Sequence, residues 1–297
     1  MKNKLLQKRN IIKIAVILLV LAFLFVTDHF GFYERLYGRN SGKNYVKFLS
    51  VGQNDCTVVC SNDKFMLIDA GGAQDEGLGM IKQLYRCGVR EIEYIVITHQ
   101  QNTRAAALPA ILEKFKVNHV VVGENMFSDT SDLTRRILKS LENNNVSVTE
   151  VGKGDKLEIE GAVLEFLWYF EGDIVSENYL IPALEMKSKR FVFGNDVPIN
   201  EERKMVAENT ILKCDVLKAS RHGGASSNCE EFVLAADPDI CIISCGEYKY
   251  TNFPSNKVIE RLKKFDIDYM TTFESGNITF DLNEMSVTPE IKETQPT

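Results

Sequence analysis

The stretch Leu67-Ile68-Asp69-Ala70-Gly71-Gly72 contains the end of an apolar strand, which is expected over 65–68, and the loop that follows it. This loop begins with an aspartate and contains two glycines. This places an acidic side chain beside backbone that a ligand can approach closely. Taken alone, an aspartate before two glycines is usually a turn residue that hydrogen-bonds its own backbone. Strand ends that carry Asp or His recur at 97–101, 193–196 and 217–224. The set of four is more specific than any member, and it indicates that the candidate chemistry lies at strand ends.

Short apolar strands alternate with helical segments throughout residues 45–288. Strands are expected at 46–51, 57–60, 65–68, 94–98, 119–122, 216–219, 240–244, 269–272, 277–282 and 285–288, with a run of strands between 146 and 193. Helices are expected at 78–86, 105–115, 131–143, 201–208, 230–236 and 255–265. Two half-chains of strands with helices outside them predict an α/β (α+β) sandwich of two sheets covered by helices.

The charge is distributed unevenly along the chain. Residues 1–44 carry a formal charge of +6 and residues 45–297 carry −12, which together give the net charge of −6 of the whole chain. An acidic body lacks the basic surface that proteins use to contact many phosphates. Direct DNA binding is therefore not expected, although a local basic patch would still permit it.

An apolar segment at 11–27 follows a basic start. Seventeen helical residues span roughly 25 Å at about 1.5 Å each, near the lower limit for a bilayer core. A cleaved signal peptide is the alternative, but the exit at 25–30 (FVTDHF) lacks the small residues that cleavage requires. The segment therefore predicts an uncleaved transmembrane signal anchor.

The anchor defines the expected organisation of the chain. Basic residues before it favour a cytoplasmic N-terminus at 1–10, followed by the helix at 11–27. A juxtamembrane linker is expected at 28–44, the body at 45–288 and a polar tail at 289–297. We expect a single-pass protein of the plasma membrane whose body lies outside the cytoplasm.

The seven cysteines do not require disulfides. Their number is odd, and the chain is long enough to be stable without covalent cross-links. Cys56 and Cys60, like Cys241 and Cys245, lie four apart in strand-like runs, which separates them by about 13 Å. We expect all seven to be small apolar core residues.

Five stretches together resemble the metallo-β-lactamase-fold domain of ComEC-type competence proteins. They are 46–55 (VKFLSVGQND), 67–72 (LIDAGG, for LIDTGG), 216–224 (VLKASRHGG, for VLKxxHHGS), 243–246 (ISCG) and 254–255 (PS). The resemblance covers about 45–288. It implies an αββα sandwich, metal-dependent hydrolysis of phosphodiesters and a link to DNA uptake.

The resemblance also implies a metal site with one or two ions, commonly Zn²⁺ or Mn²⁺, which would activate a bound water. His99 matches the first ligand of the family's THxDxDH-like loop, Asp196 matches the bridging aspartate, and His222 matches the second histidine of HHGS. Other residues stand at the remaining ligand positions: Gln101, Thr103, Arg104, Arg221 and Phe253.

These departures leave too few ligands for two metals. A catalytic ion needs about three protein ligands, and a guanidinium cannot act as one because it keeps its proton. A single weakly held Zn²⁺ or Mn²⁺ on His99, Asp196 and His222 is the alternative to having no cofactor. Without an ion, Asp69 and Asp196 would lack compensation, so we expect Arg104 and Arg221 to pair with them. The competing interpretation is that both arginines face solvent.

The resulting hypothesis is an anchored, catalytically degenerate ComEC-like domain that acts by binding or as a structural component. The alternatives are a phosphodiesterase or nuclease with a reduced one-metal site, and a domain that binds anions without turnover. Whether the chain is an enzyme stays open, and the expected partner is a protein or an anionic ligand. The candidate catalytic residues are Asp69, His99, Asp196 and His222, and the candidate anion-binding residues are Arg104, Lys218 and Arg221.

Overall fold

The structure is a computed structural model that describes residues 42–172, 177–246 and 253–290, together with 13, 16–20 and 22–23. Most of the predicted anchor at 11–27 and linker at 28–44 lies outside the described residues, as does the tail from 291. Among the described residues, no helix is long and apolar enough to cross a membrane.

Two β-sheets form the centre of the described body. The first sheet has the order β15-β14-β1-β2-β3-β4-β5-β6. Its strands are β1 (Asn44–Phe48), β2 (Thr57–Ser61), β3 (Lys64–Ile68), β4 (Glu91–Val96), β5 (Lys116–Gly123), β6 (Ser147–Val151), β14 (Asn277–Asp281) and β15 (Ser286–Glu290). The second sheet has the order β13-β12-β11-β10-β9-β8-β7. Its strands are β7 (Lys156–Ile159), β8 (Ala162–Phe170), β9 (Tyr179–Met186), β10 (Lys189–Phe193), β11 (Val216–Lys218), β12 (Ile240–Ile243) and β13 (Asp268–Thr271).

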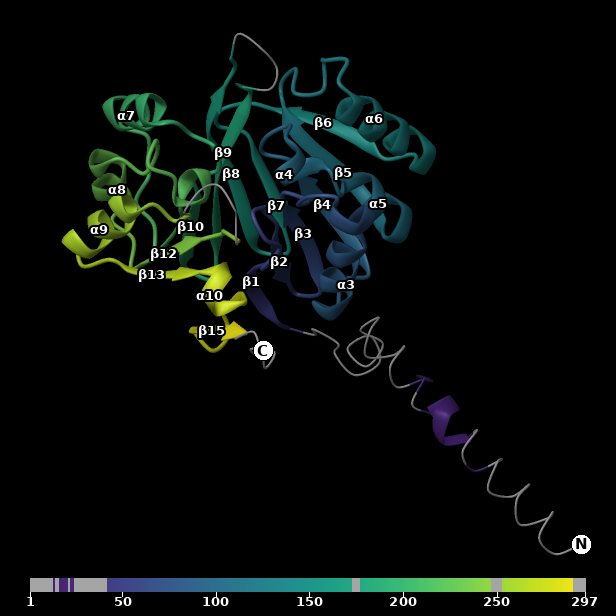
Figure 1. Ribbon diagram of the computed structural model, residues 1–297. Coiled ribbons are helices and arrows are strands. Elements are labelled where there is room, and N and C mark those ends of the chain that lie inside the picture. The colour runs from purple at the N-terminus through teal and green to yellow at the C-terminus, as the bar shows by residue number, and fades with distance from the viewer. Residues whose placement is uncertain are drawn as a thin grey trace, which may run out of the picture.

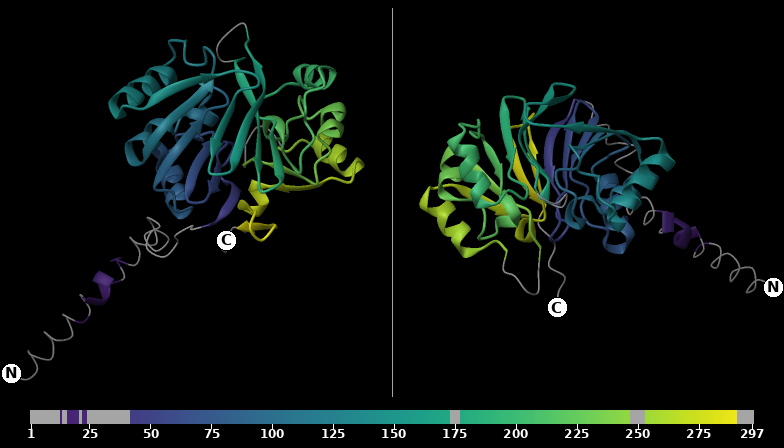
Figure 2. Two further views of the ribbon diagram at one scale, coloured as in Figure 1. Left: turned by 180° about the vertical axis from the view of Figure 1, so that it is seen from behind. Right: turned by 90° about the horizontal axis from the view of Figure 1, so that it is seen from above.

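Helices cover the outer face of each sheet (Figures 1 and 2). The first sheet carries α3 (Leu78–Arg86), α5 (Leu108–Lys114) and α6 (Asp132–Asn144). The second carries α7 (Ile199–Ala207), α8 (Glu230–Ala236) and α9 (Asn256–Lys264). Short turns of helix complete the described elements: η1 (Gln74–Gly77), α4 (Asn102–Ala105), η3 (Ser220–Gly223) and α10 (Thr272–Ser275). The predicted αββα sandwich is confirmed.

The elements differ from expectation mainly at their ends. The helix expected at 105–115 is the shorter α5, and a separate turn of helix, α4, precedes it. Pro109 lies in the first turn of α5, where the fixed φ of proline is compatible with a helix start but not with a helix interior. The separate α4 is what brings Arg104 into the centre of the molecule, as described below.

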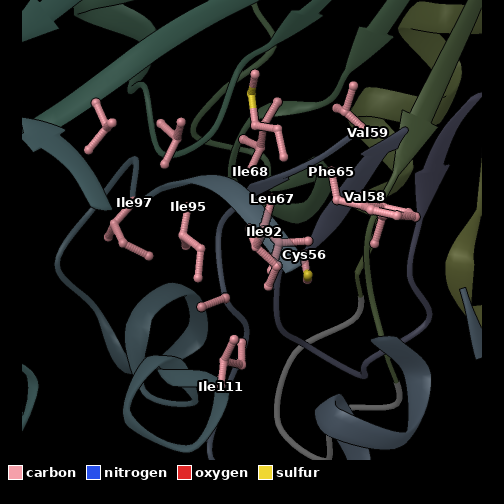
Figure 3. Close-up of a cluster of buried hydrophobic side chains, with 14 of the residues drawn as sticks. Cys56, Val58, Val59, Phe65, Leu67, Ile68, Ile92, Ile95, Ile97 and Ile111 are labelled. Atoms are coloured by element: carbon pink, nitrogen blue, oxygen red, sulfur yellow. The ribbon is translucent and has the colours of Figure 1, made fainter. Parts of the chain in front are cut away.

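The core has one layer between the sheets and one under each set of helices. Phe48 of β1 contacts Phe193 of β10 across the sandwich, with ring centroids 6.1 Å apart, and Phe280 packs edge-on against Phe48. On the outer face of the first sheet, Ile111 of α5 lies against the strand side chains (Figure 3). All seven cysteines are buried and free, as expected.

Parallel strands determine where loops meet. β3 and β4 are parallel, and so are β10, β11 and β12. The carboxyl ends of parallel neighbours lie at one edge of a sheet. The loops that follow these strands therefore meet at one edge of the sandwich, which is the location of the candidate site.

Candidate functional site

A buried ionic cluster lies where these loops meet. It contains five charged side chains: Asp55, Asp69, Arg104, Asp196 and Lys218. Asp55 comes from the loop between β1 and β2, Asp69 directly follows β3, and Asp196 follows β10. Arg104 belongs to α4 and Lys218 is the last residue of β11. The predicted strand-end sites therefore do come together in space.

Arg104 is the centre of the cluster. Its side chain has no solvent exposure. Its Nη1 lies 2.7 Å from Asp55 Oδ2 and 2.8 Å from Asp69 Oδ2. Its Nε donates to Asp196 Oδ2 at 2.7 Å. One guanidinium thus contacts three carboxylates.

Backbone hydrogen bonds hold the α4 segment in place. The amide of Ala70 donates to the carbonyl of Arg104 at 2.6 Å, and the amide of Asp55 donates to the carbonyl of Thr103 at 3.0 Å. The Arg104 segment is therefore bonded to both loops that carry the aspartates. Its position follows from the backbone as well as from the attraction of charges.

Asp69 is fixed by the neighbouring strand. It has a positive φ of 63°, a left-handed conformation in which Asp is one of the better tolerated residues. The amide and hydroxyl of Thr98 both donate to Asp69 Oδ1 at 2.9 Å. Burial raises the pKa of Asp69, and the attraction of Arg104 only partly offsets it.

Asp55 lies between two cations. Lys218 Nζ is 2.6 Å from Asp55 Oδ1, and both side chains are almost completely buried. Burial alone would raise the pKa of Asp55, but the charges of Arg104 and Lys218 outweigh it and hold the pKa well below its ordinary value. Asp55 is therefore an ionised carboxylate in the interior.

Asp196 shares one oxygen between two donors. His99 Nδ1 is 2.6 Å from Asp196 Oδ2, the atom that also accepts from Arg104. Against the effect of burial, Arg104 and the hydrogen bond from His99 hold the pKa of Asp196 well below its ordinary range. His99 is thus placed to orient this carboxylate toward Arg104.

His222 borders the cluster on the side of Asp55. Its Nδ1 donates to the carbonyl of Ser244 at 2.9 Å and is 3.8 Å from Asp55 Oδ2. Burial lowers the pKa of His222. Because a carbonyl oxygen only accepts, this contact assigns the proton of the neutral ring to Nδ1.

The structure brings the predicted site residues together but changes the role of one arginine. The expected pairing of Arg104 with Asp69 and Asp196 is confirmed. The prediction that Arg221 also pairs with an aspartate is wrong, because Arg221 is exposed and its Nη1 contacts Ser226 Oγ at 3.4 Å. Arg221 and His222 both have left-handed φ in η3, and in this turn the histidine is half-buried beside Asp55 while the arginine is exposed.

Sequence reasoning missed Asp55 as a member of the site. It stands at the end of the quoted 46–55 stretch, and an acidic residue in a loop that precedes a buried strand was the available signal. Lys218 was expected to bind anions. It is instead 2% exposed and paired with Asp55. Three aspartates, one arginine and one lysine give the five-residue cluster a formal charge of −1.

The described residues do not fit the metal that the family implies. A permanently charged guanidinium lies within 2.8 Å of the carboxylate oxygens and would repel a dication at that position. Gln101 is exposed. Among the residues that the structure describes, no group of three or more His, Cys, Asp or Glu is arranged to hold an ion.

Comparisons with known proteins agree with the architecture. A family model described as the metallo-beta-lactamase superfamily matches residues 49–170. ComE operon protein 3 of Bacillus subtilis is 25% identical over 259 residues, which cover 81% of this chain and 33% of that protein. Recombination protein 2 of Haemophilus influenzae is 22% identical over 248 residues, which cover 78% of this chain and 28% of that protein. The chain spans about a third of the length of these curated relatives.

Solved structures with the same architecture have little sequence in common with the chain. The metallo-beta-lactamase fold protein YhfI of Bacillus subtilis matches with a TM-score of 0.54 at 9% identity, over 80% of this chain and 100% of that one. CmlA, a diiron beta-hydroxylase from Streptomyces venezuelae, matches with a TM-score of 0.53 at 14% identity, over 80% and 54%. At these identities the likeness shows the fold alone.

Proposed function

Because the chain carries a metallo-β-lactamase domain similar to those of ComEC-family competence proteins, we propose that it is a non-hydrolytic member of this group. It acts by binding a partner or as a structural component, not by turning over a substrate. It is anchored by residues 11–27, with its body outside the cytoplasm of the cell.

The observation that carries this proposal is the position of Arg104. In metal-dependent hydrolases a cation held by protein ligands makes a bound water acidic enough to attack. Here the carboxylates surround a guanidinium, which cannot lose its proton and cannot coordinate a water as a metal does. The cluster supplies charge balance to the fold and has no group left to activate a nucleophile in that way.

The charges of the site favour a protein partner over a nucleic acid. Arg104 and Lys218 are buried and paired with aspartates, so their charge is not available to an external anion. Arg221 is the exposed member of the three candidate anion-binding residues. Together with the −12 charge of residues 45–297, this arrangement disfavours the many phosphate contacts that DNA binding uses.

The test is metal content and hydrolysis with the full chain in detergent. After incubation with excess Zn²⁺ or Mn²⁺ and desalting, elemental mass spectrometry should find a metal-to-protein ratio near zero. The protein should also fail to cleave single-stranded DNA, double-stranded DNA and bis(p-nitrophenyl) phosphate. A ratio near one, with hydrolysis that His99→Ala abolishes, would overturn the proposal and support the one-metal phosphodiesterase.

The anchor has its own test. When the full chain is expressed in a bacterial host, it should sediment with the membranes, and neither high salt nor alkaline carbonate should extract it. Protease added to spheroplasts should digest the body but not an epitope placed before residue 11. Digestion of the epitope with protection of the body would reverse the proposed orientation.

A further inference from the structure

A groove lies at the edge of the sandwich opposite the ionic cluster. Asp215 directly precedes β11 and Asp239 directly precedes β12, and both line this groove. It therefore lies at the amino ends of the parallel strands, whereas the cluster lies at carboxyl ends. The groove has a volume of about 280 Å³ and separates the second sheet from the hairpin of β14 and β15 in the first. We call it the β15 groove.

The lining of the β15 groove is mainly apolar. Phe191, Val216 and Phe280 are buried, and the rings of Phe191 and Phe280 pack edge-on with centroids 5.5 Å apart. Met285 and Val287 also line the groove, yet they are 58% and 40% exposed. An exposed apolar surface with polar residues around it is typical of a protein interaction site, and methionine adapts well to a partner's shape.

The rim of the β15 groove is acidic. Its charged residues are Lys189, Asp215, Asp239 and Asp281, with a formal charge of −2. Lys189 Nζ lies 2.5 Å from Asp215 Oδ1 and 3.7 Å from Asp239 Oδ2, and the Asp239 side chain is 76% exposed. Asp281 Oδ1 accepts from the amide of Asn283 in the turn before β15. The lysine can offset only one of the three carboxylates, so the rim keeps a surplus of negative charge.

The size and charge of the groove restrict what it can bind. Small-molecule sites begin at roughly 300 Å³, so this groove suits one or two side chains of a partner better than a cofactor. The acidic rim disfavours nucleic acids and other anions. Arginine pairs well with carboxylates, and arginine and large apolar residues are enriched where proteins meet.

The groove lies on the side of the body where the chain enters it. The amide of Leu282 donates to the carbonyl of Asn44 at 2.8 Å, and Asn283 Nδ2 donates to the carbonyl of Gly42 at 2.7 Å. The start of β1 and the strand β15 both lie at the bottom of Figure 1. Gly42 is fifteen positions from the end of the proposed anchor, which limits the distance between them to about 50 Å. A partner is therefore expected near the membrane.

We propose that the β15 groove binds a segment of a partner protein in which arginine or lysine stands beside large apolar side chains. An apolar side chain of the partner packs against Phe191 and Phe280, and its cation pairs with Asp239 or Asp281. The inference rests on the proposed function, because it assigns the surface and the partner class of a domain that acts by binding.

The first experiment tests the charge of the rim. The probe is a fluorescent peptide in which arginines alternate with leucine and phenylalanine, and a control peptide carries glutamate in place of arginine. Full chain in non-ionic detergent should bind one copy of the first peptide and none of the second, as measured by fluorescence anisotropy. Asp239→Lys should weaken binding at least tenfold. Asp132→Lys makes the same change at an 87% exposed position in α6 and should alter the affinity less than twofold.

Equal weakening by the two lysine variants would show only a general attraction to an acidic protein and would overturn the proposal. A wild type that binds neither peptide would overturn it as well.

The second experiment tests the apolar lining. Val287→Ser should weaken binding of the arginine peptide at least fivefold, because the peptide loses an apolar contact. Val148 is 38% exposed in β6, at the other end of the same sheet, so Val148→Ser is the matched control and should leave the affinity unchanged. Unchanged binding by Val287→Ser would show that the peptide does not enter the β15 groove.

Other occupants would give different results. If the peptide binds only after Arg35→Ser and Arg39→Ser are introduced, the chain's own segment at 28–43 fills the groove, and the assignment to a separate protein is wrong. Self-association of the wild type in sedimentation, abolished by Val287→Ser, would assign the groove to a second copy and would also overturn it.

The outcomes separate this inference from the proposed function. A wild type that is free of metal, inactive as a hydrolase and unable to bind the arginine peptide would contradict the groove inference alone. Metal binding with hydrolysis would contradict the proposed function, whatever the peptide result.

Discussion

Lys218 Nζ lies 2.6 Å from Asp55 Oδ1, and this contact joins the end of β11 in the second sheet to the loop between β1 and β2 of the first. Arg104 makes the reverse connection, from the half of the chain that forms the first sheet to Asp196 after β10. Each half of the sandwich therefore places a cation against an aspartate of the other. The ionic cluster connects the halves at the same edge where metal ligands of the fold would meet.

Lys218 and Asp55 should be energetically coupled. Lys218→Met leaves Asp55 with one cation, and Asp55→Asn leaves Lys218 buried without its partner, so each single change should cost about 3 kcal/mol of unfolding free energy. The double variant removes both charges and should cost less than the sum by about 1 to 3 kcal/mol. Urea unfolding of the four proteins measures this difference. Additive losses would show that the 2.6 Å contact contributes no coupling.

Arg104 and Arg221 should differ sharply in their contribution to stability. Arg104→Ala leaves the buried Asp55 and Asp69 and the partly buried Asp196 poorly compensated, and should lower the unfolding free energy by about 3 to 5 kcal/mol. Arg221→Ala removes an exposed side chain and should change it by about 0.5 kcal/mol or less. Chemical denaturation in parallel measures both. Equal losses would contradict the central position of Arg104.

The sequence predicted the fold more completely than the site. Periodicity and strand-end loops were enough for two sheets covered by helices, because buried faces impose regular spacing. The pairing of Arg104 followed from charge, since two buried aspartates need compensation. The position of Arg221 did not follow, because it depends on the left-handed turn at 220–223, which no residue type in that stretch requires.

Asp55 shows the other limit of sequence reasoning. Its partners Arg104 and Lys218 lie 49 and 163 positions away in the chain, and nothing local in 46–55 indicates an ion pair. The hydrogen bond from the Asp55 amide to the Thr103 carbonyl holds the Asp55 loop against the Arg104 segment, and the packing of the second sheet on the first brings Lys218 to Asp55. A motif can therefore indicate the edge of the sheet where a site lies, while tertiary packing decides which charges meet.

The aromatic contact between the sheets should be essential for stability. Phe48 is fully buried and contacts Phe193 and Phe280. Phe48→Ala should therefore cost about 3 to 5 kcal/mol, from lost burial and the cavity that remains. Phe273 is 46% exposed, so Phe273→Ala should cost about 1 kcal/mol or less and serves as the matched control. Similar melting temperatures for the two variants would show that the contact of Phe48 with Phe193 and Phe280 does not contribute to stability as expected.

Acid should weaken the cluster. The pKa values of Asp55 and Asp196 are held below their ordinary value of 3.8 in the folded chain. An unfolded chain then binds more protons than the folded one in this range, so the unfolding free energy falls as the pH drops below about 4. Asp69, whose pKa is raised by burial, acts in the opposite direction above about pH 4, where the folded chain takes up its proton before the unfolded chain does.

The measurement is urea unfolding of the wild type and of Asp55→Asn between pH 3 and pH 7. The wild type should lose stability steeply below about pH 4, since Asp55 and Asp196 are protonated there in the unfolded chain but not in the folded one, whereas Asp69 acts only at higher pH. Asp55→Asn lacks one of the two carboxylates whose pKa values are lowered. Its unfolding free energy should therefore be smaller than that of the wild type at pH 7, and should decrease less steeply as the pH falls. Parallel curves would mean that the pKa of Asp55 is the same in the folded and the unfolded chain, so that Lys218 and Arg104 do not stabilise its charge.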